Sequence, residues 1–196
     1  MKRWRVDGDP SDDVLDELAG ILRGGGVALL PTDTIYGLHA VATDERAIAR
    51  IAAIKGRPDD KPFVVIAASI DQLRALGATI PDPLGKIWPA PLTAILASGE
   101  TTIAARIPDL GWLRALLDRT GPLVSTSANR SGEPSVSSPQ ALANDLQNDL
   151  DALLDQGPRE AKPSTIVDFT GDEPRFIREG DPVFSQFLRK TLWKAL

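Results

Sequence analysis

Short apolar runs alternate with segments of helical periodicity along this chain, and this alternation constrains the fold most. In residues 11–23 apolar side chains recur every three or four positions, and glycines follow at 24–26. The run at 27–30 is continuously apolar and ends at Pro31, which is typical of a buried strand. The pattern predicts further helices at 44–55, 70–76, 112–120, 137–147 and 181–196, and strands at 62–68, 92–98, 102–108, 121–125, 150–155, 164–169 and 174–179.

The order of these segments predicts the fold class. Strands and helices interleave, which is typical of α/β proteins. The runs at 92–98 and 102–108 flank a short Gly-containing turn and are expected to form an antiparallel pair. We therefore expect a single α/β domain over residues 1–196, with an open, twisted, mixed sheet flanked by helices.

The residue types that are absent exclude several kinds of chemistry. The 196 residues include no Cys and one His, which excludes disulfides, thiolate metal sites and His-rich metal sites. No apolar run approaches the roughly 18 residues of a membrane-spanning helix. The first residues lack the apolar segment of a signal peptide, so a cytoplasmic location is expected. Neither a P-loop nor a Gly-x-Ser-x-Gly motif is present.

Polar segments gather at the ends of the predicted strands. They occupy residues 31–38, 55–62, 104–108, 125–135, 162–165 and 177–180. Ligands of open α/β sheets bind in the loops at strand ends, so these segments are expected to converge on one cleft. The most unusual is STSANRSGEPS at 125–135, where small hydroxyl and amide side chains directly follow an apolar run.

Basic residues in these segments raise the question of anion binding. Lys55, Arg57 and Lys61 lie within seven residues, and either a solvated loop or a phosphate site would explain them. Arg106 sits in an otherwise apolar strand end, where its charge must be paired or must face a ligand. Arg178 raises the same question, and there a surface strand end is the favoured explanation. His39, the single histidine, receives no assigned role.

The motifs together resemble the YrdC/TsaC family, the threonylcarbamoyl-AMP synthases. The blocks that carry the resemblance are PTDTIYGL (31–38), KGRPDDKP (55–62), WPAPLTAIL (88–96), ARIP (105–108), STSANRSGEPS (125–135), STIVD (164–168) and IREG (177–180). They occur in the order of the family and span residues 25–180, which leaves 181–196 as a terminal helix. The chain resembles the short, stand-alone branch. Asp33 stands where the family often has Glu, and Ser125 where it often has a small apolar residue.

The resemblance implies a YrdC-like fold with a concave, positively lined cleft. It also implies the synthesis of L-threonylcarbamoyladenylate and pyrophosphate from L-threonine, bicarbonate and ATP. Mg²⁺ would be carried on the ATP phosphates, without a metal site in the protein or a tightly bound organic cofactor. Partner proteins would transfer the threonylcarbamoyl group to tRNA, and binding of tRNA or double-stranded RNA is a further implication.

The resemblance also implies roles for individual residues, none of them a nucleophile. Lys55, Arg57 and Lys61 would act as positioning groups near the phosphates. The implied ATP-binding residues are Arg57, Lys61, Thr102, Ser127, Asn129, Ser135 and Arg178. The implied threonine-binding residues are Thr34, Arg106, Ser125 and Ser164.

Two other functions are compatible with the sequence. A non-catalytic RNA-binding module would use the same basic loops, although the net charge of −5 opposes tight, non-specific binding of nucleic acid. A related enzyme of the same fold could form another carbamoyl-type adenylate, since a fold does not determine its substrate.

Overall fold

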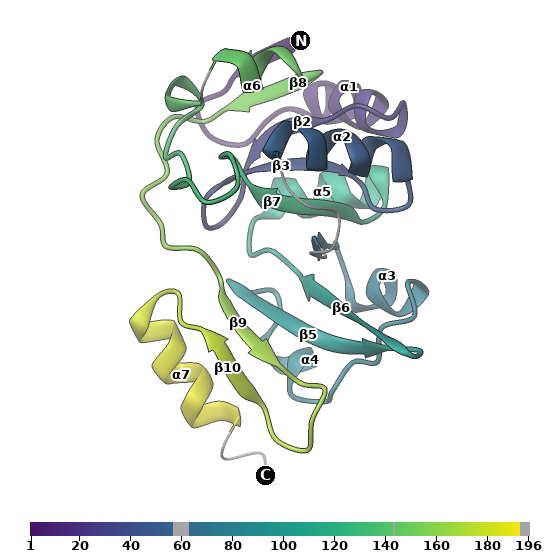
Figure 1. Ribbon diagram of the computed structural model, residues 1–196, viewed down its shortest axis with the longest axis vertical. Helices are drawn as coiled ribbons and strands as arrows, with labels where there is room; N and C mark the ends of the chain where they lie inside the picture. The colour runs from purple at the N-terminus through teal and green to yellow at the C-terminus, as the bar shows by residue number, and fades with distance from the viewer. Residues whose placement is uncertain (57–62, 143, 193–196) are drawn as a thin grey trace.

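The computed structural model describes residues 1–56, 63–142 and 144–192, and their strands form one mixed sheet flanked by helices (Figure 1). The strands are β1 (Lys2–Arg5), β2 (Ala28–Pro31), β3 (Tyr36–Val41), β4 (Val64–Ile66), β5 (Leu92–Ser98), β6 (Thr101–Arg106), β7 (Leu123–Ser127), β8 (Ala152–Asp155), β9 (Thr165–Asp168) and β10 (Arg175–Arg178). The helices are α1 (Asp12–Arg23), α2 (Glu45–Lys55), α3 (Ile70–Ala75), α4 (Leu84–Ile87), α5 (Gly111–Thr120), the 3₁₀ helix η1 (Pro139–Ala141), α6 (Asn144–Asn148) and α7 (Pro182–Leu192).

The strand order across the sheet is β1-β8-β2-β3-β7-β4-β6-β5-β9-β10. The parallel neighbours are β1–β8, β2–β8, β4–β6 and β5–β9, and the other neighbouring pairs are antiparallel. The predicted hairpin is β5–β6, in which Ser98 pairs with Thr101. The prediction of a mixed α/β sheet is therefore confirmed.

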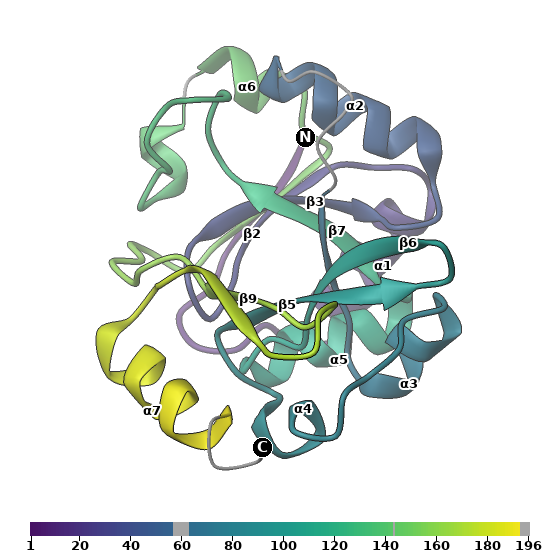
Figure 2. The ribbon, with the colours of Figure 1, turned by 60° about the horizontal axis from the view of Figure 1, so that its bottom comes forward.

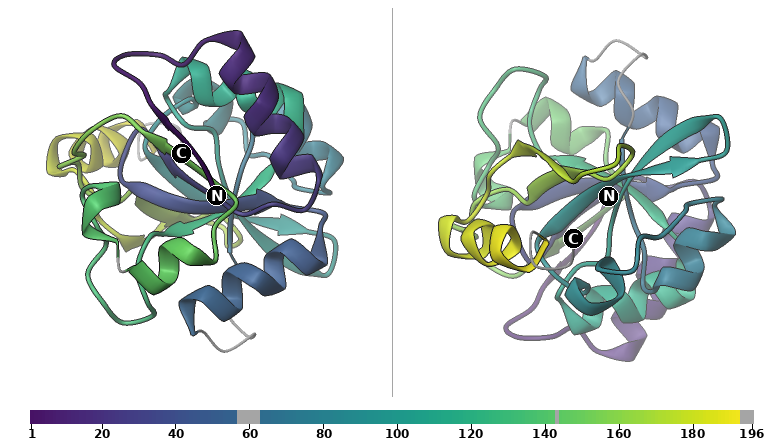
Figure 3. Two further views of the ribbon diagram at one scale, coloured as in Figure 1. Left: turned by 90° about the horizontal axis from the view of Figure 1, so that it is seen from above. Right: turned by 90° about the horizontal axis from the view of Figure 1, so that it is seen from below.

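Apolar clusters hold helices on both faces of the first half of the sheet (Figures 2 and 3). Helices α1 and α5 contact each other and share one cluster with Leu30 of β2. Helices α2 and α6 share another cluster with the adjacent Leu29. Because neighbouring strand residues point to opposite faces, the two helix pairs cover opposite sides of this half of the sheet.

The second half of the sheet has its own core. Helices α3, α4 and α7 pack around β5 and β9 through Leu73, Leu84, Leu92 and Leu188. This arrangement divides the helices into an upper and a lower group in Figure 1, with the same sheet running through both. The central strands β3, β7, β4 and β6 join the two groups.

Parts of the structure differ from the sequence-based expectation. Residues 36–38, predicted as part of the polar segment 31–38, instead begin the buried strand β3. The helix predicted at 137–147 is divided into η1 and α6, and the N-terminal strand β1 had not been predicted. Within the described residues, no helix combines the length and the apolar character needed to cross a membrane.

Candidate functional site

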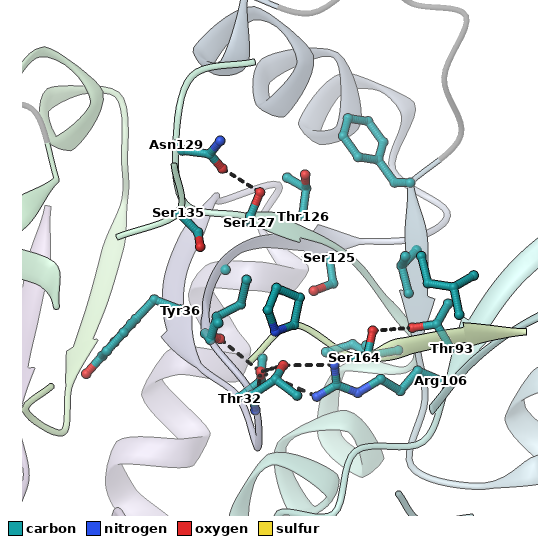
Figure 4. Close-up of a pocket in the computed structure, with 18 of the residues that line it drawn as sticks. Thr32, Tyr36, Thr93, Arg106, Ser125, Thr126, Ser127, Asn129, Ser135 and Ser164 are labelled. Carbon is teal, nitrogen blue, oxygen red and sulfur yellow. Dashed lines mark hydrogen bonds between the residues drawn. The ribbon is translucent and has the colours of Figure 1, made fainter. Parts of the chain in front are cut away.

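A cavity of about 370 Å³ lies among the central strands and gathers most of the predicted site residues (Figure 4). Its walls come from the β2–β3 turn, from β7 with the turn that follows it, and from the ends of β6, β9 and β10. The predicted residues that line it are Thr34, Arg106, Ser125, Ser127, Asn129, Ser135, Ser164 and Arg178. Segments more than a hundred residues apart in sequence therefore meet here, as the strand-end argument predicts.

Arg106 forms the charged end of the cavity. Its Nη1 donates to Thr34 Oγ1 at 3.0 Å and its Nη2 donates to Thr32 Oγ1 at 3.4 Å. Nη2 also pairs with the carboxylate of Asp33. The second carboxylate oxygen of Asp33 accepts from the backbone N–H of Asp109 at 3.1 Å. Both explanations of Arg106 thus hold, because its charge is paired and the side chain also lines the cavity.

The β2–β3 turn is built to hold these groups in place. Thr32 Oγ1 donates to the carbonyl of Ile35 at 2.9 Å and accepts from the backbone N–H of Thr34 at 3.1 Å. The side chains of Thr32 and Thr34 are buried, with hydroxyl oxygens 3.0 Å apart. A short turn closed by its own hydroxyl therefore presents Asp33 and Thr34 to the guanidinium in fixed positions.

Arg106 is positively charged at neutral pH. Burial, and to a smaller extent the positive charge of Arg178, lower its pKa to about 9. Guanidinium groups carry five N–H donors. Arg106 commits three of them in the described part of the chain, to Thr34, Thr32 and Asp33. One donor on Nη1 and the buried Nε therefore remain without a partner among the described residues.

Arg178 at the end of β10 and Ser164, directly before β9, close the same end of the cavity. Arg178 Nε and Nη2 donate to the carbonyl of Ser164 at 3.1 and 2.9 Å, and Nη2 reaches Ser164 Oγ at 3.3 Å. Ser164 Oγ lies 2.8 Å from Thr93 Oγ1 on β5. Two guanidinium groups and several hydroxyls around one space suit a carboxylate or a phosphate.

The turn after β7 forms the other end of the cavity. Ser127 Oγ donates to Asn129 Oδ1, as the upper dashed line in Figure 4 shows. Asn129 Nδ2 donates to the carbonyls of Arg130 at 2.8 Å and Glu133 at 2.5 Å. Asn129 thus shapes the turn, while Ser127 and the exposed Ser135 present hydroxyls to the cavity.

Lys55, predicted as a positioning group near the phosphates, does not line the cavity. It is 5% exposed, and its Nζ donates to the carbonyls of Ser127 and Asn129 at 2.7 and 2.8 Å and to Asn129 Oδ1 at 3.2 Å. The carbonyl of Lys55 accepts from the backbone N–H of Ser131. Its position at the end of α2, stopped by Gly56 in the left-handed conformation, aims the ammonium at the turn after β7. It positions the turn instead of facing the cavity.

Thr102 is another predicted residue that does not line the cavity. Thr102 is exposed at the start of β6, opposite Ala97, four residues before Arg106. Because a strand rises about 3.3 Å per residue, it lies more than about 10 Å along the strand from the cavity end. Thr102 therefore lies away from this cavity, and its implied contact with the nucleotide stays a prediction. Arg57 and Lys61 lie outside the described residues.

Some lining residues had not been singled out from the sequence. They are chiefly Thr32, Thr93, Thr126 and Glu133. Tyr36 also lines the cavity, and its hydroxyl donates to the carbonyl of Gly157 at 2.8 Å and accepts from the Gln156 N–H at 3.0 Å. Burial raises the pKa of this phenol. Tyr36 lies inside the PTDTIYGL block, so the block was recognisable from the sequence although its buried strand was not.

Residues 20–180 match the model of the Sua5/YciO/YrdC family, which carries the description "Telomere recombination". The chain belongs to the Sua5/YciO/YrdC family. Its sequence is 35% identical over 178 residues to the threonylcarbamoyl-AMP synthase of Pyrococcus abyssi, covering 83% of this chain and 52% of that protein. It is 34% identical to that of Bacillus subtilis, covering 91% of this chain and 58% of that protein.

Members of the Sua5/YciO/YrdC family also differ in length. The chain spans about half the length of the two relatives just named. It is 37% identical to the threonylcarbamoyl-AMP synthase of Chromobacterium violaceum over 75% of this chain and 84% of that protein.

Solved structures of the Sua5/YciO/YrdC family share the fold. P. abyssi Sua5 complexed with L-threonine aligns with a TM-score of 0.89 at 31% identity, covering 98% of this chain and 61% of that one. E. coli YciO aligns with a TM-score of 0.81 at 28% identity, covering 92% and 96%. The predicted family and its twisted mixed-sheet fold are thus confirmed.

Proposed function

We propose that this chain is an L-threonylcarbamoyladenylate synthase, which forms threonylcarbamoyl-AMP, pyrophosphate and water from L-threonine, bicarbonate and ATP. The observation that carries the proposal is the buried guanidinium of Arg106 in one cavity with the hydroxyl-rich turn after β7. Relatives named threonylcarbamoyl-AMP synthase and a threonine-bound Sua5 of the same fold support it.

Threonine would occupy the Arg106 end of the cavity. Its carboxylate would accept hydrogen bonds from the guanidinium donors that Thr32, Thr34 and Asp33 leave free. Ser164 and Ser125 line the same region and would contact the remaining polar groups of the amino acid. The nucleotide would occupy the end formed by Ser127, Asn129 and Ser135.

This placement suits the two bond-forming steps. The threonine amine and bicarbonate give a carbamate and water. A carbamate oxygen then attacks the α-phosphorus of ATP, the bond from that phosphorus to the bridging oxygen breaks, and pyrophosphate leaves. Both substrates are held at fixed ends of one cavity, so the second step becomes effectively intramolecular. Arg106 and Arg178 would stabilise the anionic groups.

Mg²⁺ would enter the cavity as part of the ATP substrate. It prefers phosphate oxygens together with one or two carboxylates. Among the described residues that line the cavity, Glu133 supplies a carboxylate. The Ser and Thr hydroxyls beside it are neutral oxygen ligands. This donor set fits an ion that arrives with the nucleotide, and Mg²⁺ would offset the charge of the triphosphate.

The product would pass to tRNA through partner proteins. We place tRNA downstream of this cavity, because a cavity of about 370 Å³ suits small molecules. Direct binding of tRNA or double-stranded RNA would use another surface and would be strongly salt-dependent. An RNA-binding module without catalysis would bind RNA without consuming ATP, which separates it from the proposed enzyme.

Pyrophosphate release tests the proposed function directly. The protein is incubated with ATP, Mg²⁺ and bicarbonate, with threonine, serine, glycine or no amino acid. We expect release that requires bicarbonate and that is fastest with threonine. Equal release with serine or glycine would contradict the substrate and favour a related carbamoyl-adenylate enzyme, and no release with any of them would contradict the reaction.

A further inference from the structure

A fully buried histidine lies directly behind the cavity wall. His39 is on β3, in antiparallel register with Ser125 on β7, and is 0% exposed. Its Nε2 lies 3.1 Å from Ser125 Oγ. Ser125 lines the cavity and His39 does not. The imidazole therefore contacts a lining hydroxyl from the protein side.

The imidazole occupies space that Gly37 leaves free. Gly37 and His39 are two residues apart on β3, so their side-chain positions face the same way. A Cβ at position 37 would lie 2.9 Å from His39 Cε1 and 3.3 Å from its Nε2. It would also lie 3.0 Å from the carbonyl oxygen of Thr126. A glycine at this position is thus required for the ring to reach Ser125.

The imidazole makes its contact in the neutral form. Burial lowers the pKa of His39 to about 4. In either neutral tautomer Nε2 can bond to Ser125, as the donor or as the acceptor. Nδ1 has no hydrogen-bond partner among the described residues. Among the described residues, His39 is the hydrogen-bond partner of Ser125 Oγ. This contact therefore sets the rotation of the hydroxyl.

We propose that His39 is a positioning residue that holds the Ser125 hydroxyl in the orientation that contacts the amino-acid substrate. Ser125 lies between the Arg106 end of the cavity and the turn that carries Ser127 (Figure 4). A hydroxyl that is already oriented binds without first losing rotational freedom, which favours affinity. The kinetic consequence rests on the proposed function, whereas the His39–Ser125 contact does not.

Two amide variants separate positioning from packing. In His39→Gln the amide can stand near the place of Nε2 and reach Ser125, whereas the shorter side chain of His39→Asn ends near the place of Nδ1. We expect His39→Asn to raise the threonine KM about tenfold, the effect of one lost hydrogen bond. His39→Gln should remain close to wild type, and the ATP KM should be largely unchanged in both. An unchanged threonine KM in His39→Asn would overturn the proposal.

A double-mutant cycle tests whether His39 acts through Ser125. Ser125→Ala should raise the threonine KM, and adding His39→Asn to it should have little further effect. If the two substitutions instead multiply in the double variant, His39 acts by another route and the proposal is wrong.

Imidazole nitrogen NMR tests the contact without relying on activity or on His39 variants. The chain has one histidine, so the two ring-nitrogen signals of isotope-labelled protein belong to His39. We expect Ser125→Ala to shift the Nε2 signal and to leave Nδ1 nearly unchanged. An Nε2 signal that does not shift in Ser125→Ala would overturn the proposal. If the wild-type protein had no synthase activity, the proposed function would be wrong. The NMR measurement would still show whether His39 contacts Ser125.

Discussion

At the scale of single residues, Arg106 is the group on which the proposed chemistry depends most. It is a buried cation that pairs with Asp33 and still has N–H donors for a ligand. Replacement by alanine would leave the Asp33 carboxylate buried and unpaired, at a cost of about 3–5 kcal/mol in stability. Lysine keeps the positive charge but lacks the planar guanidinium. Arg106→Lys therefore tests the hydrogen-bond geometry without removing the charge.

The prediction for Arg106→Lys is a selective loss of threonine affinity. We expect the threonine KM to rise at least about tenfold, because lysine cannot reproduce the charged N–H contacts of the guanidinium with the carboxylate. The ATP KM should change little, since the proposed nucleotide position is at the other end of the cavity. Steady-state kinetics with each substrate varied in turn provides the check. Equal increases in both KM values would contradict the assignment of Arg106 to the carboxylate.

For Lys55 we expect a different outcome from that for Arg106, because Lys55 supports the turn after β7. Lys55→Met removes an ammonium that donates to Ser127 and Asn129, and leaves buried acceptors unsatisfied. We expect a loss of about 3 kcal/mol in the free energy of unfolding and a higher ATP KM. The exposed Lys190 on α7 provides the matched control, Lys190→Met. Denaturation curves that are the same for both variants would refute the supporting role.

The sequence predicted residue types at this site better than it predicted their orientation. Of the ten predicted residues that the structure describes, eight line the cavity, because motif blocks locate a position along the chain. Lys55 was predicted near phosphate because the family resemblance placed it beside Arg57 and Lys61. Its burial depends on the turn 72 residues later, which no local pattern reveals. Thr102 illustrates the same limit, since strand register decides which end of β6 reaches the cavity.

At the scale of elements, long periodic segments were predicted and short atypical ones were not. Helix α2 was recognisable from its periodicity, and Asp44 caps it by accepting from two backbone N–H groups. Strand β3 was missed because it contains Gly37 and His39 directly after a turn-forming sequence. Strand β1 is mostly charged and pairs only with β8 at one edge of the described sheet.

The connection between β10 and α7 depends on a close backbone contact. A Cβ at Gly180 would lie 2.2 Å from the carbonyl oxygen of Pro163 and 2.9 Å from the backbone nitrogen of Thr165. The N–H of Gly180 also donates to Thr165 Oγ1 at 3.1 Å. This contact holds β10 against the segment that carries Ser164, and so keeps Arg178 at the cavity.

Gly180→Ala should therefore impair both stability and activity. We expect a loss of about 1–3 kcal/mol in the free energy of unfolding, because the backbone must shift to make room. The synthase rate should fall as Arg178 is displaced. Gly171→Ala is the control, since its nearest atom would be 4.0 Å from the new Cβ. Thermal unfolding and pyrophosphate release that match between the two variants would contradict this prediction.

At the scale of the whole molecule, the fold buries its single imidazole in a neutral state. The pKa of His39 falls from 6.5 to about 4 through burial, so the unfolded chain binds its proton more readily than the folded chain does. This contribution to stability is complete above pH 6.5 and is lost as the pH falls towards 4.

The free energy of unfolding of the wild type should thus fall by about 3 kcal/mol more than that of His39→Gln between about pH 7 and about pH 4. Urea unfolding of both proteins across this range measures the difference. Parallel stability curves would show that His39 is not held neutral. The comparison also tests the burial on which the His39–Ser125 contact depends.

The whole molecule also brings the two ends of the proposed reaction into one space. The β2–β3 turn, the turn after β7 and the end of β9 meet only because the ten described strands form a single twisted sheet. The central claim is that this cavity joins a threonine carbamate to a nucleotide. A binding module would not form that bond, and an enzyme for another substrate would not form it with threonine.

The most direct test is to supply isotopically labelled bicarbonate with ATP, Mg²⁺ and threonine and to follow the label by mass spectrometry. The account predicts label in an adenylate with the mass of threonylcarbamoyl-AMP, formed together with pyrophosphate and strongly reduced in Arg106→Lys. ATP consumption without label in such an adenylate, or equal labelling without threonine, would contradict it.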